Sequence, residues 1–164
     1  MKRLWAPWRE RYVKGTGDDE GCVFCRIGSE PSRDRDNYVL HRSERTMVVL
    51  NRFPYINGHL MVVPCRHVPD LRSLKAEELG EMIDLVRVSE EALFEGMGCM
   101  GINGGWNLGR CAGAGVEGHV HLHVLPRWSG DVNFMTSVAE VRVLSESLES
   151  SYDQLLPFFE GRDR

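Results

Sequence analysis

The sequence predicts an α+β fold with a mainly antiparallel sheet. Short strand-like runs come first, one long helical pattern follows, and further strand-like runs come after it, so strands and helices do not alternate along the chain. The 164 residues suit one domain and are enough to bury a sizeable core. We therefore expect a single domain over residues 1–164, with an N-terminal arm at 1–20 and a C-terminal extension at 129–164.

Three strands are expected before the helix. Residues 38–42 and 46–50 are β-branched or aromatic runs separated by a few polar residues, which is typical of a hairpin. A turn rich in proline, asparagine and glycine follows. Residues 59–63 then form a third strand, which ends at Pro64 because proline cannot donate to a sheet ladder.

One long helix is expected between about Lys75 and Gly96. Ser73 is the expected N-cap, and Gly96 is the expected end. Twenty-odd residues at about 1.5 Å each span roughly 30 Å, enough to cross one face of a sheet. Apolar residues recur at helical spacing and charged residues cover the other face. The apolar set is Leu79, Met82, Ile83, Val86 and Leu93.

The remaining segments add strands and a terminal helix. Strands are expected near 97–103 and at 119–125, with a short candidate at 138–144, and a helical stretch runs to about Phe159. The polar stretch from Gly28 to Asn37 is interpreted as loop.

Charge and composition exclude several classes of protein. The formal net charge is −4 and the sequence pI is near 5.9. A general polyanion binder carries a basic excess, so no nucleic-acid partner is expected, although a local basic pocket stays open. No apolar run is long enough to span a membrane, and the N-terminus lacks the apolar core of a signal peptide. We expect a cytoplasmic protein with no membrane partner. Its five cysteines are an odd set, which disfavours a disulfide framework.

Glycines cluster late in the chain. Of 17 glycines, 8 lie between Gly98 and Gly118. An isolated cluster of this kind is more often a flexible loop, but this one leads directly into a row of histidines. Closely spaced glycines let backbone N–H groups converge on an anion. We expect phosphate binding here, with Gly113 and Gly115 as the candidates.

Three histidines alternate with apolar residues from His119 to His123. In a strand, His119, His121 and His123 share one face, which gathers half of the 6 histidines in the chain. A solvent-exposed polar face is one interpretation. A metal site is another, but the outer two residues lie roughly 13 Å apart, which makes all three on one ion improbable. Nucleophilic catalysis is the third, because a neutral imidazole can attack phosphorus.

The segment His119-Val-His-Leu-His-Val-Leu resembles the signature of the histidine triad (HIT) superfamily. The upstream Asn51-Arg-Phe-Pro-Tyr-Ile-Asn-Gly-His-Leu segment is similar to the first block of that family. The glycine-rich approach and the Pro126-Arg-Trp that follows resemble the branch with bacterial diadenosine tetraphosphate phosphorylases and related hydrolases. The resemblance covers about residues 4 to 145.

This resemblance implies a fold and roles for particular residues. It implies a five-stranded antiparallel sheet with one long helix and a C-terminal helix, in a homodimer with a continuous ten-stranded sheet. His121 would be the nucleophile on the α-phosphorus, and His123 would assist the leaving group. His119 would orient them or ligate a metal. Asn51 would contact the ribose, and Asn107 the phosphates.

Cys22-x-x-Cys25 is open to three interpretations from its spacing. It is a redox pair, two incidental thiols, or half of a zinc site. The family resemblance favours zinc and implies that His67 and His119 complete a structural site, with His41 as the competing ligand. The remaining cysteines, expected as packing residues, are Cys65, Cys99 and Cys111.

Base recognition has the weakest support in the sequence. The family holds a purine in an apolar cleft, and candidates to wall it are Phe53, Leu50, Trp5 and Trp8. The two tryptophans could equally be core or dimer contacts.

The function implied is a nucleotidyl transferase or hydrolase that cleaves a dinucleoside polyphosphate through a nucleotidyl-histidine intermediate. Phosphorolysis is slightly favoured over hydrolysis. Two alternatives remain: a nucleoside phosphoramidate hydrolase of the same superfamily, and a zinc-containing nucleotide-binding protein without turnover.

Overall fold

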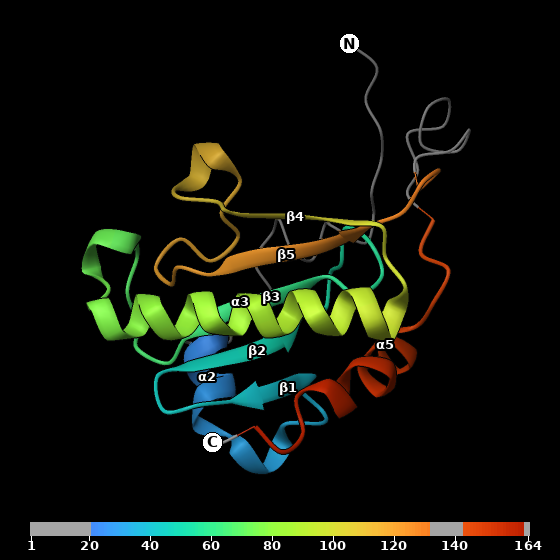
Figure 1. The fold of residues 1–164 in the computed structure, drawn as a ribbon. Helices are drawn as coiled ribbons and strands as arrows, with labels where there is room; N and C mark the ends of the chain where they lie inside the picture. Colours follow the sequence, from blue (N-terminus) through green and yellow to red (C-terminus); the bar gives the residue numbers. More distant parts are fainter. Residues whose placement is uncertain (1–20, 132–142, 163–164) are drawn as a thin grey trace.

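The computed structural model describes residues 21–131 and 143–162, and in them a five-stranded antiparallel sheet is covered by helices on both faces (Figure 1). The strand order β1-β2-β3-β5-β4 makes β1 and β4 the two edges. This confirms the predicted α+β class. The strands are β1 (Val39–Arg42), β2 (Thr46–Leu50), β3 (Leu60–Pro64), β4 (Gly101–Trp106) and β5 (Leu122–Arg127).

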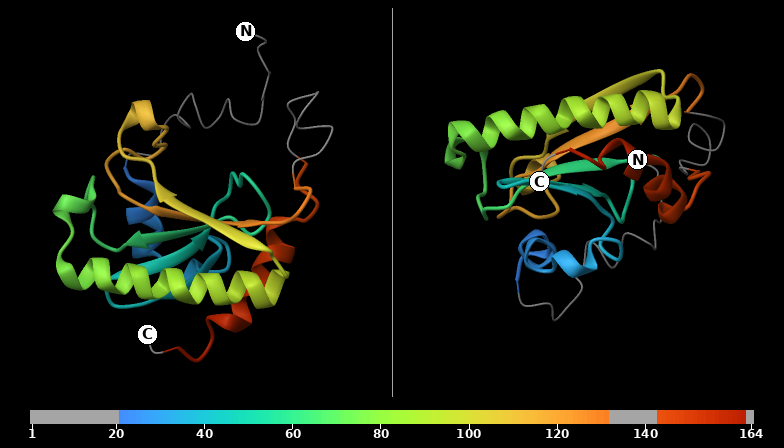
Figure 2. Two further views of the ribbon diagram at one scale, coloured as in Figure 1. Left: turned by 45° about the horizontal axis from the view of Figure 1, so that its top comes forward. Right: turned by 60° about the horizontal axis from the view of Figure 1, so that its bottom comes forward.

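The central strands are buried on both faces, so alternate residues enter two separate cores. On one face Val62 and Val124 pack with residues of the long helix α3 (Ala76–Met97). On the other face Met61 and Val63 pack with Phe24 of the short helix α2. Figure 2 shows α3 and α2 on opposite sides of the sheet. The alternation of the strands therefore decides which residues face α2.

The caps of the long helix α3 lie two residues later in the chain than the sequence predicts. Its N-cap is Lys75, whose backbone N–H donates to Glu78 at 2.7 Å, whereas Ser73 belongs to the preceding 3₁₀ turn and is bonded to Asp70. The helix continues through Gly96 to a left-handed C-cap at Gly98, where φ is +60°. A positive φ, rather than the first glycine reached, marks the end of the helix.

This extension moves the next strand. The expected strand at 97–103 is observed as β4, from Gly101 to Trp106, because the helix occupies residue 97. The expected strand at 119–125 is observed as β5, from Leu122 to Arg127. β5 includes Pro126, which lies one residue beyond the expected end of this strand. β3 pairs with β5 only as far as Val124, so the missing N–H of Pro126 lies beyond that ladder.

One helix was missed by the sequence prediction. This helix, α2, spans Val23–Ser29 and buries Phe24 and Ile27 against the sheet. The predicted C-terminal helix is confirmed as α5 (Leu148–Leu155), followed by a 3₁₀ turn. The proposed arm at 1–20 and residues 138–142 of the strand candidate lie outside the described residues.

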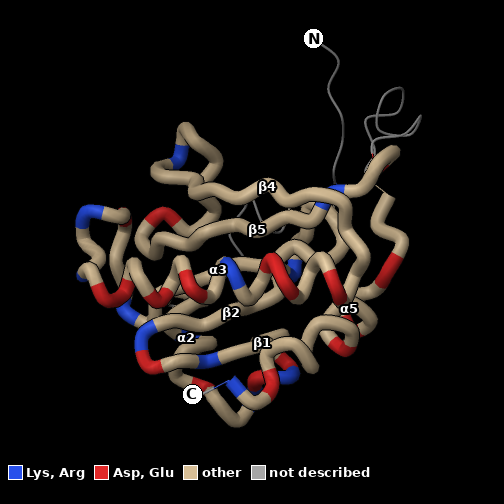
Figure 3. Tube along the Cα trace, in the orientation of Figure 1, with Lys and Arg blue, Asp and Glu red and all other residues tan. Residues whose placement is uncertain are grey.

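Charges are interspersed along the described chain (Figure 3), in keeping with the small net charge. Among the described residues, none of the helices combines the length and the apolar character that a membrane span requires.

Candidate nucleotidyl-transfer site

The three histidines of the row are buried, and of the three only His123 lies within a strand. His123 lies in β5 opposite Met61 of β3, on the face that α2 covers. His119 and His121 lie in the extended segment before β5, which is held by the Val120 N–H donating to Val68 at 2.7 Å. The rings of His121 and His123 meet edge to face, with centroids 4.8 Å apart.

A hydrogen bond fixes the tautomer of His121. Its Nδ1 lies 2.9 Å from the carbonyl oxygen of His119, and a carbonyl only accepts. Nδ1 therefore carries the proton, and Nε2 keeps its lone pair. Phe24 packs against the same ring, with centroids 4.9 Å apart. Burial lowers the pKa of His121, which favours the neutral imidazole.

A second chain of hydrogen bonds fixes His123 in the opposite tautomer. The Tyr55 backbone N–H donates to His59 Nδ1 at 3.2 Å, so that nitrogen is an acceptor and the proton is on Nε2. His59 Nε2 then donates to His123 Nδ1 at 2.9 Å. The proton of His123 is consequently on Nε2. Burial, followed by the charge of His121, lowers the pKa of His123 to about 4, so this ring is neutral at physiological pH.

The two asparagines predicted to contact substrate both lie at this network. Asn51 Nδ2 approaches His59 Nδ1 at 3.3 Å, and the Asn51 side-chain oxygen accepts from the Phe53 N–H at 2.9 Å. Asn107 Nδ2 lies 3.3 Å from His123 Nε2. With two N–H donors side by side, the Asn107 and His123 pair is suited to an oxygen acceptor from a third group.

His59 was missed as a site residue, although the sequence contained a signal for it. It is fully buried immediately before β3, two residues before Met61, and so lies on the side of the strand that faces His123. The period of a strand, combined with an antiparallel register between β3 and β5, places it there. His59 belongs to the third expected strand and to a segment similar to a family block, but the sequence assigns it no role in the site.

The four predicted metal ligands come together. The ligand atoms of Cys22, Cys25, His67 and His119 all lie within 4.8 Å of one another. Sulfur-to-Nδ1 distances are 3.2 Å for Cys22–His119, 3.6 Å for Cys25–His119 and 3.3 Å for Cys25–His67. A tetrahedral zinc, with bonds of ~2.3 Å to sulfur and ~2.0 Å to nitrogen, places such pairs about 3.5 Å apart. The donor set and its spacing therefore fit zinc.

The surroundings of His119 support a metal-binding role. Its Nε2 lies 2.7 Å from the Pro64 carbonyl oxygen, so Nε2 carries the proton and Nδ1 is left as a ligand atom. The competing ligand His41 lies in β1, near Phe159, outside this cluster. Cys99 is buried as expected, whereas Cys65 and Cys111 are exposed, which corrects their assignment as packing residues.

The glycine-rich segment is an ordered turn. Gly109 and Gly113 have φ of +81° and +90°, which explains glycine at those two positions. The Gly113 N–H donates to Arg110 at 3.0 Å, so that donor is already used inside the turn. Gly115 is exposed and lies farther along the same segment.

Two of the residues predicted to line a base-binding cleft are described by the structure, and the fold places them apart. Leu50 is 2% exposed and packs in the core under α3, on the sheet face opposite the histidines. Its side chain cannot line the site, because neighbouring residues of a strand face opposite ways. Phe53 is 45% exposed and lies beside Asn51. Trp5 and Trp8 fall outside the described residues.

The chain matches the HIT domain over residues 32–130. It belongs to the HIT domain family. A protein named AP-4-A phosphorylase from Mycobacterium tuberculosis is 33% identical over 157 residues, covering 92% of this chain and 80% of that protein. The asymmetrical bis(5′-nucleosyl)-tetraphosphatase of Schizosaccharomyces pombe is 32% identical over 93 residues, covering 57% of this chain and 50% of that protein. This chain is therefore similar to nucleotide-processing enzymes.

A solved HIT structure carries a metal. The zinc-bound histidine triad family protein from Mycobacterium smegmatis is 29% identical, with a TM-score of 0.69 over 85% of this chain and 93% of that one. It confirms the HIT-like fold. Together with the clustered cysteines and histidines, it supports a metal site in this HIT chain.

Proposed function

We propose that this protein transfers a nucleotidyl group from a dinucleoside polyphosphate, such as diadenosine tetraphosphate, to inorganic phosphate through His121. One observation carries the proposal: adjacent buried rings hold complementary tautomers. His121 presents a lone pair on Nε2, and His123 presents an N–H on Nε2. Nucleophilic attack and assistance to the leaving oxygen need this combination.

In the first step the lone pair of His121 Nε2 attacks the α-phosphorus. The bond between that phosphorus and the bridging oxygen breaks, and ATP leaves from diadenosine tetraphosphate. His123 Nε2–H donates to the departing oxygen. The adenylylated imidazole still carries hydrogen on Nδ1 and is cationic, and the His119 carbonyl oxygen at 2.9 Å stabilises this charge.

In the second step an oxygen of inorganic phosphate attacks the same phosphorus. The phosphorus–nitrogen bond breaks, ADP forms, and the electron pair returns to His121 Nε2. The attacking oxygen of hydrogen phosphate is unprotonated, so the proton of that phosphate stays on the β-phosphoryl group of ADP and His123 keeps its Nε2–H in both steps. The M. tuberculosis relative favours phosphate as acceptor, whereas the S. pombe relative makes water the second candidate, with AMP as the product.

The remaining site residues are assigned to binding. Asn107 Nδ2 and His123 Nε2–H both donate to a phosphate oxygen, as their 3.3 Å spacing allows. Asn51 contacts the ribose, and Phe53 covers the base. Gly115 is the remaining glycine candidate for the phosphate chain, since the Gly113 N–H is used within its turn.

Zinc is the metal proposed for Cys22, Cys25, His67 and His119. When bound it is structural, because the four ligands complete a tetrahedron. The carbonyl of His119 accepts from His121, and Phe24 of the cysteine-bearing helix packs on His121. Fixing His119 and α2 therefore fixes the orientation of the nucleophile.

A homodimer through strand β4 is proposed as well. β4 is an edge of the sheet and contains Gly104 and Gly105, which let another backbone approach closely. Exposed apolar side chains precede it along the chain: Phe94 at 45% and Met100 at 71%. Pairing of two β4 strands would give the ten-stranded sheet that the family resemblance implies.

Product analysis tests the reaction. The protein is incubated with diadenosine tetraphosphate, with and without phosphate, and the nucleotides are separated. Phosphate-dependent ADP plus ATP supports phosphorolysis, whereas AMP plus ATP identifies the hydrolase. Faster turnover of an AMP-amine substrate would instead favour the phosphoramidate hydrolase, and nucleotide binding without products would favour a protein that does not turn over.

A further inference from the structure

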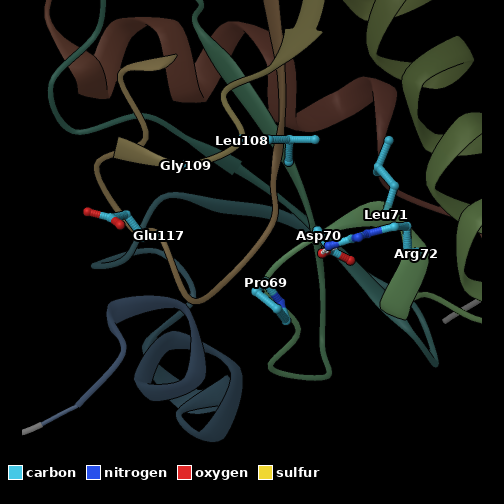
Figure 4. A pocket seen from close by; sticks show the side chains of 7 residues that line it. All are labelled: Pro69, Asp70, Leu71, Arg72, Leu108, Gly109 and Glu117. Atoms are coloured by element: carbon cyan, nitrogen blue, oxygen red, sulfur yellow. Dashed lines mark hydrogen bonds and ion pairs between the residues drawn. The ribbon is translucent and has the colours of Figure 1, made fainter. Parts of the chain in front are cut away.

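A pocket of about 530 Å³ lies between the loop after β3 and the glycine-rich segment (Figure 4). This volume is within the range of small-ligand sites. None of its residues takes part in the chemistry proposed for the histidines. The lining residues are Pro69, Asp70, Leu71, Arg72, Leu108, Gly109 and Glu117.

The walls of the pocket continue directly from the histidine site. Leu108 follows Asn107, whose amide lies 3.3 Å from His123 Nε2. On the other wall, Pro69 follows Val68, whose carbonyl accepts from the Val120 N–H at 2.7 Å. Each wall of the pocket therefore begins at the residue next to one that contacts the histidine segment.

The lining suits a flat heterocyclic base. Leu71 and Leu108 supply aliphatic surface, and Leu108 is 42% exposed and extends toward the side on which Leu71 lies (Figure 4). Arg72 adds a planar guanidinium that Asp70 holds, through Nε at 3.1 Å and through Nη2 to the same oxygen. A guanidinium held in this way can stack on an aromatic ring.

The acidic residues of the lining do not oppose a polyphosphate. The Asp70 carboxylate is used by Arg72 and by Ser73, whose N–H and Oγ lie at 3.1 and 3.0 Å. The Glu117 carboxylate points away from the pocket in Figure 4 and lies 3.7 Å from Arg110. The pocket therefore presents apolar surface and an exposed guanidinium whose charge Asp70 balances.

We propose that this pocket binds the distal nucleoside of the dinucleoside polyphosphate, the one that leaves with the polyphosphate when His121 attacks. The inference rests on the proposed function and assigns the part of the substrate that the histidine site leaves without partners. The polyphosphate runs from His121 past Asn107, and the distal base lies between Leu108, Leu71 and the Arg72 guanidinium.

Two substrates that differ only in the distal nucleoside test the assignment. Adenosine 5′-tetraphosphate has the same phosphate chain as diadenosine tetraphosphate but lacks the second adenosine. We expect kcat/KM to be about 10-fold higher for the dinucleotide, the effect of stacking one base. Leu108→Ser and Arg72→Ala should remove this preference by raising KM for the dinucleotide, and should leave adenosine tetraphosphate unchanged.

The controls separate stacking from charge. Arg72→Lys keeps the charge and loses the plane, so it should behave like Arg72→Ala. Arg87→Ala removes an exposed arginine that pairs with Asp84 at 3.4 Å on α3 and should change neither substrate. Equal effects of Leu108→Ser on both substrates, or no effect on either, would overturn the assignment.

Failure of the proposed reaction can be distinguished from failure of the pocket assignment. If the protein releases no product from diadenosine tetraphosphate, the proposed function is wrong, and calorimetric binding of the two nucleotides then tests the pocket alone. Tighter binding of the dinucleotide that Leu108→Ser abolishes supports the pocket. Equal binding of both nucleotides by the unmodified protein refutes it.

Discussion

His59 Nε2 lies 2.9 Å from His123 Nδ1, and both rings are buried. Because the Tyr55 backbone N–H points at the other nitrogen of His59, this contact decides which nitrogen of His123 carries a proton. In the proposed mechanism His59 would act through His123, as a positioning residue. Its importance was not visible from the triad motif.

Replacing His59 with leucine should lower kcat by about 10- to 100-fold and leave KM nearly unchanged, because His123 loses the donor that fixes its tautomer. His59→Gln retains an N–H in a similar place and should restore most of the rate. Steady-state kinetics of both variants checks this. An equal fall in kcat in both variants, or a change confined to KM, would show that His59 only fills space.

His121→Asn should reduce turnover by about 10³-fold or more, because the amide cannot form the nucleotidyl intermediate. Brief incubation with radiolabelled substrate, followed by alkaline denaturation, should label the unmodified protein and leave the variant unlabelled. His41→Asn is the matched control, since His41 is also a buried histidine but lies in β1 outside the site. Full turnover by the His121 variant would exclude covalent catalysis through this ring.

Cys22→Ser should lower bound zinc from about one ion per chain to near zero, with a loss of thermal stability, because one ligand of a closed site is removed. Cys65→Ser is the matched control: Cys65 is free and exposed and lies outside the cluster. Elemental analysis and thermal unfolding of both variants give the answer. Retained zinc in Cys22→Ser would remove that thiol from the ligand set.

The order of the strands and the long helix could be predicted because their signals are local. β-branched runs and apolar residues at helical spacing occur where β1, β2, β3 and α3 lie. α2 was missed because only Phe24 and Ile27 mark its buried side, and its helix comes from packing on the sheet. The end of α3 at Gly98 depends on a positive φ, which composition does not reveal.

Site residues that belong to a sequence motif could be predicted. Site residues whose position depends on which strands and loops pack together could not. Two histidines of the row, and the four residues predicted to bind a metal, come together as the resemblance implied. The prediction that Leu50 lines the base-binding cleft was wrong, because Leu50 pairs with Leu60 on the face of the sheet opposite His123. His59 and the pocket beside Leu108 depend on register and loop packing, which one sequence does not specify.

Glu78 should make stability depend on pH in the acidic range. Its carboxylate lies 2.7–2.8 Å from Arg66, which is the main cause that lowers its pKa from 4.5 to about 2. Since the folded pKa is below the unfolded one, the stabilisation is present above about pH 4.5 and is lost as the pH falls toward 2. Glu78→Gln should cost about 1–3 kcal/mol at neutral pH.

Denaturant unfolding of Glu78→Gln and the unmodified protein at neutral pH and at pH 3.5 measures this difference. The difference in free energy of unfolding between the unmodified protein and Glu78→Gln should become smaller at pH 3.5. Glu77→Gln, the exposed neighbour in the first turn of α3, should change stability little at either pH. If the difference in free energy of unfolding between the unmodified protein and Glu78→Gln is the same at both pH values, the ion pair with Arg66 does not cause it.

Two glycines of α3 should respond oppositely to alanine. A Cβ at Gly80 would meet nothing within 4 Å apart from its chain neighbours and the backbone of its own helix, so Gly80→Ala should stabilise the protein by about 0.5–1 kcal/mol through helix propensity. At Gly96 the same Cβ would lie 2.7 Å from Cε2 of Phe158, so the ring that packs the C-terminal turn against α3 must move. Gly96→Ala should therefore lose that gain and destabilise the protein. Thermal unfolding of the two variants compares them directly, and equal stabilisation by both would mean that Phe158 is not held against the helix.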